Sequence, residues 1–231
     1  MARSEPERGG GGEPTLATLL GGRGGAVDAT VPVVAFVGVF TLADVQVWAW
    51  PVAWAGGAAV LAGAAVGTVR LATGKPARSV VLGLLGVTVA ALVALSTGRA
   101  VDFFLVQIVS NAASALVWAV SIVARWPLLG IIVGTLLGQR TRWRRDPDLM
   151  RGYQRASWAW VAQYLVRLAT LLPLYAAGAI VPLGIARVLL TWPLVGLCVF
   201  ISWPLLRSAL PPEHGGLRHP RDPADRPASS T

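Results

Sequence analysis

The sequence predicts an all-α fold, namely a polytopic membrane helix bundle with six transmembrane helices and one short re-entrant or interfacial segment. Hydrophobic residues make up 55% of the 231 residues and charged residues only 13%, whereas globular proteins average about 25% charged residues. The apolar residues form blocks that approach or exceed the ~18 residues of a membrane span. The intervening segments are rich in arginine, which is typical of cytoplasmic loops.

Six apolar blocks are expected to form the spans. Pro32 lies in the first turn of the first block, where proline is tolerated. The second block begins at Pro51 and contains Gly63 and Gly67, a spacing that lets neighbouring helices approach closely. The expected spans are residues 29–47, 51–69, 79–97, 103–124, 157–181 and 184–206.

The segments outside these blocks complete the expected organisation. Residues 126–138 are apolar but fall short of the ~17 residues that a span needs, so they suit a re-entrant or interfacial segment. Residues 139–156 form a basic cytoplasmic loop. The membrane domain therefore covers residues 15–207, and the polar tails 1–14 and 208–231 are expected to be disordered.

The distribution of positive charge predicts the orientation. If both termini lie in the cytoplasm, 17 of the 20 Lys and Arg residues face the cytoplasm and only Arg99 faces the opposite side. A seventh span at residues 126–138 would reverse the orientation of everything that follows. We therefore expect a multi-pass protein of a bacterial plasma membrane with cytoplasmic termini.

Several polar residues fall inside the predicted spans, where ionisable groups cost about 2.5–3.5 kcal/mol each and are candidate functional sites. Arg167 and Asn111 are expected at similar depth, and Arg187 near the outer ends of the spans, close enough to pair with Asp102 or Asp44. The candidate intramembrane polar cluster is Asp44, Asp102, Gln107, Asn111, Gln163, Arg167 and Arg187.

This cluster has two interpretations. In the functional one, it lines a cavity for an anionic substrate or lipid headgroup, and Arg167 is the anchor because its planar fork bonds both oxygens of a carboxylate or phosphate. In the structural one, the same groups hydrogen-bond one another, Arg167 with Asn111 or Gln163, and fix the register of the helices.

The basic loop is a second candidate site. Juxtamembrane arginines attract anionic lipid headgroups at about 1 kcal/mol per charge, although they also serve to set topology alone. A role in nucleic-acid binding is not expected. The candidate anionic-lipid contacts are Arg140, Arg142, Arg144, Arg145, Arg151 and Arg155.

The sequence holds no recognisable catalytic or metal-binding motif. The single cysteine, Cys198, lies in an apolar block, and the two histidines, His214 and His219, lie in the C-terminal tail. No P-loop, Gly-x-Ser-x-Gly turn or paired-histidine metal motif occurs. We therefore expect no cofactor, no metal site and no enzymatic activity.

Several short elements occur in an order that resembles an actinobacterial DUF family of uncharacterised integral membrane proteins, over about residues 16–207. The elements are Leu20-Gly-Gly-Arg23, Asp102-Phe-Phe, Asn111-Ala, Trp143-Arg-Arg-Asp-Pro147, Arg167 with Pro173-Leu-Tyr175, and Leu183-Gly with Ala186-Arg187. Arg125 to Leu128 and the tryptophan-rich fifth span are more distantly similar to the intracellular septation protein A family. That similarity implies a role in envelope maintenance or division through contact with other membrane proteins.

The sequence favours a structural or interaction component of the cell envelope. Its expected partners are anionic lipids on the cytoplasmic face, other membrane proteins or a second copy of itself. The alternative is a small-solute or lipid transporter that uses the intramembrane polar cluster.

Overall fold

The fold is a bundle of helices, seen in a computed structural model that describes residues 22–139, 141–211 and 215–217. Every regular element in those ranges is helical, which confirms the predicted all-α class. The α-helices are α2 (Gly22–Val45), α3 (Pro51–Ala72), α4 (Ala77–Thr97), α5 (Leu105–Val123), α6 (Leu128–Leu136), α7 (Pro147–Ala176) and α8 (Ile180–Ser208). Two short 3-10 helices are η1 (Ala100–Phe104) and η2 (Arg142–Arg145).

Four helical segments of the described chain are long and apolar enough to cross a membrane. They are Pro51–Ala72, Ala77–Thr97, Ala100–Val123 and Ile180–Ser208. The apolar part of α2, Ala29–Val45, is shorter. Helix α7 is long enough but carries charged and amide side chains along its length. The expectation of six spans therefore depends on α2 and α7 in addition to these four.

Helix α7 begins well before the expected fifth span. Its first residue is Pro147, so the second half of the expected loop at residues 139–156 is helical. Asp146 caps the helix, because its Oδ1 accepts hydrogen bonds from the backbone N–H groups of Asp148 at 3.0 Å and Leu149 at 3.3 Å. The helix ends at Ala176, before the expected boundary at residue 181. The expected tails at 1–14 and, for the most part, 208–231 lie outside the described residues.

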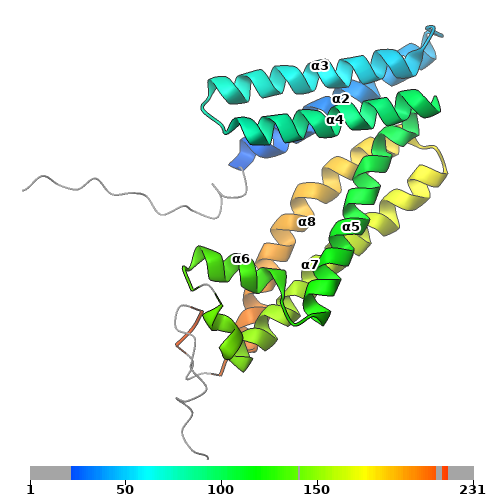
Figure 1. Cartoon of the computed structure of the whole chain (residues 1–231). Helices are drawn as coiled ribbons and strands as arrows, with labels where there is room; N and C mark the ends of the chain where they lie inside the picture. The colour runs from blue at the N-terminus through cyan, green and yellow to red at the C-terminus, as the bar shows by residue number, and fades with distance from the viewer. Residues whose placement is uncertain (1–21, 140, 212–214, 218–231) are drawn as a thin grey trace, which may run out of the picture.

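The helices form two groups of three (Figure 1). Helices α2, α3 and α4 lie side by side, and α5, α7 and α8 extend obliquely away from them, with the short helix α6 near the far end. The two groups meet where η1 packs on α4 and where α2 contacts α8. Aromatic side chains fill this junction: the rings of Phe36 and Phe103 stack with centroids 3.9 Å apart.

Gly184 brings α2 and α8 together at this junction. A Cβ atom at Gly184 would lie 2.9 Å from Cγ2 of Val37, which is closer than real side-chain contacts. The absence of a side chain on α8 thus permits the close approach of α2.

A second core lies at the opposite end of the α5–α7–α8 group. We call residues 125–156, of which residue 140 is not described, the basic module. Trp143 of η2 and Tyr153 of α7 are fully buried there, with ring centroids 5.3 Å apart. Gly130 of α6 faces this core, since a Cβ atom on it would lie 2.8 Å from the Trp143 ring. The module is therefore a packed structure rather than an open loop.

Five of the described helices end in the same turn, in which one residue takes a left-handed conformation. At α5, Trp126 N–H donates to Ser121 O at 2.8 Å and Arg125 N–H donates to Ile122 O at 3.1 Å. This is the Schellman motif, which usually places glycine at the left-handed position. The left-handed residues are Val47 (φ 55°), Gly74 (76°), Arg125 (56°), Gly138 (66°) and Gly178 (67°).

Candidate functional site

Arg167 is buried within the α5–α7–α8 group and keeps only 6% of its surface exposed. Its Nη2 donates hydrogen bonds to Gln163 Oε1 at 3.2 Å and to the backbone oxygen of Thr191 on α8 at 2.9 Å. Its guanidinium carbon lies 5.4 Å from the centre of the Tyr164 ring. Among the described residues no carboxylate forms an ion pair with Arg167, so its charge is stabilised only by dipoles and an aromatic face.

Asn111 of α5 lies level with Arg167 of α7. The Trp118 and Trp160 rings stack with centroids 5.1 Å apart and fix the register of these antiparallel helices. Asn111 and Arg167 each lie seven residues from that stack, toward the same end. Gln107 Nε2 donates to Asn111 Oδ1 at 3.4 Å, while Asn111 Nδ2, Gln163 Nε2 and Arg167 Nε are buried without a partner among the described residues. We call Gln107, Asn111, Gln163 and Arg167 the inner polar group, and it is rich in hydrogen-bond donors.

Asp102 belongs to a separate, outer group. It is buried on η1, and its Oδ1 accepts a hydrogen bond from the Tyr175 hydroxyl at 2.6 Å. The Arg99 guanidinium carbon lies 5.9 Å from the centre of the same tyrosine ring. Tyr175 is thus the hydrogen-bond partner of Asp102, a role that the sequence suggested for Arg187.

The structure does not form the expected pairing of Arg187 with Asp102 or Asp44. Asp44 is exposed at the end of α2, Arg187 is half-buried on α8, and neither forms an ion pair within the described part of the chain. The expected cluster therefore divides into the inner polar group, which consists of the hydrogen-bonded pairs Gln107 with Asn111 and Gln163 with Arg167, and an outer pair of Asp102 and Tyr175. The sequence predicted that Asn111 and Arg167 lie level, but it did not show which side chains face each other.

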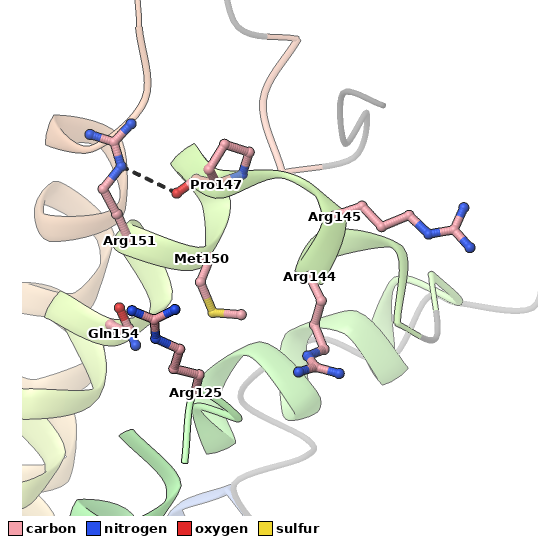
Figure 2. Close-up of a pocket in the computed structure, with 7 residues that line it drawn as sticks. All are labelled: Arg125, Arg144, Arg145, Pro147, Met150, Arg151 and Gln154. Carbon is pink, nitrogen blue, oxygen red and sulfur yellow. Dashed lines mark hydrogen bonds between the residues drawn. The ribbon is translucent and has the colours of Figure 1, made fainter. Parts of the chain in front are cut away.

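The basic module contains an open cleft of about 570 Å³. It lies between the turn that follows α5, the short helix η2 and the first turns of α7 (Figure 2). The lining residues are Arg125, Arg144, Arg145, Pro147, Met150, Arg151 and Gln154. We call this the basic cleft.

Three of the seven lining side chains are held in place by local contacts. The Arg144 guanidinium carbon lies 3.7 Å from the centre of the Trp126 ring. Arg151 pairs with Asp148 and also donates from Nε to Pro147 O at 3.3 Å. Gln154 Nε2 donates to Ile122 O at 3.4 Å. These three side chains thus need little reorganisation to receive a ligand.

The cleft carries a large excess of positive charge. Four of its seven lining residues are arginines, and only Arg151 pairs with a described carboxylate, that of Asp148. In Figure 2, Arg125 and Arg144 lie near the Met150 side chain, whereas the Arg145 guanidinium points outward. Such an arrangement attracts an anion whose oxygens accept several hydrogen bonds, and phosphate is the best match to arginine.

The described residues contain no group of three or more His, Cys, Asp or Glu side chains that could hold a metal ion. Cys198 is buried and donates to Ala159 O at 3.4 Å. The polar sites of the described chain consist of arginines, amides and aromatic rings, which are groups that bind ligands.

A model of the family described as "Protein of unknown function (DUF3159)" matches residues 20–213. The chain belongs to this family. The match covers every helix of the bundle, the inner polar group and the basic cleft. No significant match is found among curated proteins or among solved structures. Membership of DUF3159 thus places both candidate sites inside the shared domain and assigns no activity to either.

The basic cleft includes part of the predicted lipid-contact set. Arg144, Arg145 and Arg151 line it, whereas Arg142 and Arg155 are exposed outside it and Arg140 lies outside the described residues. Arg125 is not predicted from the sequence as a lipid contact and counts there only among the cytoplasmic charges that set the orientation. The available signal was its place in the run Arg125-Trp126-Pro127, directly after an apolar block.

Proposed function

We propose that this protein is a non-enzymatic structural or interaction component of the cell envelope, bound through its basic module to the anionic cytoplasmic leaflet of a bacterial plasma membrane. The observation that carries this proposal is the basic cleft, in which four arginines gather at the end of a bundle of apolar helices. Each such charge near the surface contributes about 1 kcal/mol of attraction to anionic lipid.

The proposed topology has six spans, with α2 and α7 crossing the membrane beside the four apolar segments. This arrangement places the basic module and both termini in the cytoplasm, and the turn around Gly98 on the opposite side. The strong preference for Arg over Lys, together with abundant Ala, Gly and Val, is typical of GC-rich coding and supports an actinobacterial source. Contacts with other membrane proteins, or with a second copy of the chain, would be made through the lipid-facing helices.

The lipid environment of the protein tests the proposal. The full chain is extracted from cells in polymer-bounded nanodiscs, and the lipids extracted with it are compared with those of the whole membrane. We expect enrichment of anionic phospholipids that weakens as salt rises from 0.1 to 0.5 M during extraction, because salt screens exposed charges. A composition equal to that of the whole membrane at low salt would contradict the proposal.

The inner polar group supports a second candidate function, that of a small-solute or lipid transporter. The specific observation is that Asn111 Nδ2, Gln163 Nε2 and Arg167 Nε are buried donors without acceptors in the described chain. Buried donors of this kind are costly and are expected to serve a ligand or a water molecule. These three donors line neither the basic cleft nor a second, apolar groove that lies beside Trp54 on α3.

Substitution of Arg167 by Leu distinguishes the two functions. A transport site predicts normal abundance in the membrane with loss of solute or lipid movement in proteoliposomes. A structural role predicts reduced abundance and a lower melting temperature in detergent, because the bond from α7 to Thr191 O of α8 is lost.

A further inference from the structure

We infer that the basic cleft is a discrete site for one anionic phospholipid, whose phosphate is bound by Arg125 and Arg144. This inference rests on the proposed placement of the basic module at the cytoplasmic leaflet. The inference goes beyond that placement. General attraction to an anionic membrane does not depend on any particular arginine, whereas a discrete lipid site depends on the specific pair Arg125 and Arg144.

Arg125 occupies a backbone position that favours glycine. Its φ of 56° is left-handed, and the equivalent residue is glycine at the ends of α3, α6 and α7. Holding a side chain there costs about 1 kcal/mol relative to glycine. Strain of this kind clusters at functional sites, although the exposed Val47 at the end of α2 takes the same conformation. Arg125 lines the cleft and forms no ion pair within the described chain, which leaves its charge for a ligand.

Arg144 is held rigidly by the Trp126 ring. The guanidinium lies over the ring at 3.7 Å, and its Nε is buried without a hydrogen-bond partner in the described chain. Stacking removes rotamer freedom in advance, so less entropy is lost when an anion binds. Arg125 and Trp126 are adjacent in sequence, which means that one turn positions both arginines of the pair.

The size and chemistry of the cleft fit a headgroup. Its volume of about 570 Å³ lies within the ~300–1,000 Å³ usual for small-molecule sites. Met150 and Pro147 give it an apolar wall that suits the carbon atoms of a glycerol unit. Arg145 lies at the rim, where Figure 2 shows its side chain pointing outward. From there it can reach a second phosphate or a neighbouring headgroup.

The surroundings of the cleft favour a lipid over a soluble phosphate ester. The Trp126 side chain is 43% exposed, as expected for an aromatic residue at the membrane interface. The adjacent helix α6 exposes Ile132 by 47% and Leu136 by 50%, although it is only nine residues long. An exposed apolar face beside a cationic cleft suits the acyl chains and the phosphate of one molecule.

Native mass spectrometry of the full chain in detergent tests this site. The probes are phosphatidylglycerol, phosphatidylcholine as the neutral lipid, and glycerol 3-phosphate as the soluble ester. The variant Arg125→Gln/Arg144→Gln removes the proposed pair. The variant Arg142→Gln/Arg155→Gln removes the same charge from exposed residues outside the cleft.

We expect the wild type and the Arg142→Gln/Arg155→Gln control to bind one phosphatidylglycerol in preference to phosphatidylcholine. The cleft variant should bind that molecule about tenfold or more weakly. The melting temperature of each variant shows whether it is folded. If the double variant does not fold, the single variant Arg125→Gln is used in its place.

Three results would overturn the inference. Equal losses in the cleft variant and the control would show diffuse attraction, which leaves the proposed function standing and removes the discrete site. Unchanged binding in the cleft variant would place the lipid elsewhere. Binding of glycerol 3-phosphate as tight as that of phosphatidylglycerol would assign the cleft to a soluble ester. Absence of any anionic preference in the wild type would instead contradict the proposed function itself.

Discussion

The guanidinium of Arg144 lies 3.7 Å from the centre of the Trp126 ring, and this contact joins η2 to the turn between α5 and α6. The same turn holds Arg125, so the contact of Arg144 with Trp126 fixes the position of Arg144 relative to Arg125 across the basic cleft. Substitution of Trp126 by Leu should weaken phosphatidylglycerol binding although no charge is lost, because Arg144 then regains its rotamer freedom. Trp126→Phe should retain most of the affinity, since Phe still offers a cationic side chain an aromatic face. Equal affinity for wild type and Trp126→Leu, measured by native mass spectrometry, would refute this role.

Replacement of Arg125 by Gly should separate stability from binding. Glycine takes the left-handed conformation without steric cost, so Arg125→Gly should raise the free energy of unfolding by about 1 kcal/mol. The same change removes one of the two phosphate contacts and should weaken lipid binding. Thermal unfolding in detergent, followed beside lipid titration, measures both. A variant that is less stable than wild type would show that the Arg125 side chain stabilises the fold, and strain would no longer support a binding role.

The junction between the two helix groups depends on Gly184. Gly184→Ala should lower the melting temperature, with a cost of about 1–3 kcal/mol, because the new Cβ would overlap Cγ2 of Val37 and valine is stiff within a helix. Gly196→Ala on the same helix is the matched control, since a Cβ there meets nothing within 4 Å. Adding Val37→Ala to Gly184→Ala should restore part of the loss. A loss in Gly196→Ala as large as in Gly184→Ala would point to helix flexibility instead of packing.

Tyr153 should make the basic module sensitive to alkaline pH. Burial, with a smaller contribution from the Asp146 charge, raises the pKa of the Tyr153 hydroxyl from 10.0 to about 12. The folded state therefore holds this proton more tightly than the unfolded state does. The resulting stabilisation is complete below pH 10 and is lost as the pH rises through 12, at a cost of about 3 kcal/mol.

Tyr153→Phe provides the comparison for this pH dependence. The Tyr153 hydroxyl is buried and has no partner among the described residues, so its removal should cost little at neutral pH. Between pH 10 and 12 the variant should lose less stability than the wild type, as followed by unfolding in detergent. Parallel losses in the two proteins would assign the alkaline sensitivity to other groups.

The order and approximate bounds of the helices could be predicted from the sequence because the apolar blocks are separated by proline, glycine and charge. The start of α3 at Pro51 and the end of α4 at Thr97 agree with the expected spans. The start of α7 could not be placed by hydropathy, since its first turns are basic. Its signal was local: Asp146 followed by Pro147 is a favourable helix start.

The candidate sites were predictable only in part. The depths of Arg167 and Asn111 follow from a fixed rise per residue, and the structure places them level. The partner of Asp102 depends on rotation about the helix axis and on the position of Tyr175, which lies 73 residues away in sequence. Formation of the basic cleft likewise requires the turn at Arg125 to fold back onto η2. These relationships are tertiary, and no pattern within one segment encodes them.

The proposed function requires the basic module to face the cytoplasm, and cysteine labelling shows on which side of the membrane it lies. Thr97 and Thr141 are exposed, and each is replaced by Cys in a Cys198→Ala background. In intact cells, a membrane-impermeant maleimide should label the Thr97→Cys variant and should label the Thr141→Cys variant only after the membrane is opened. Labelling of the Thr141→Cys variant in intact cells would place the basic cleft outside the cytoplasm and refute the proposed function.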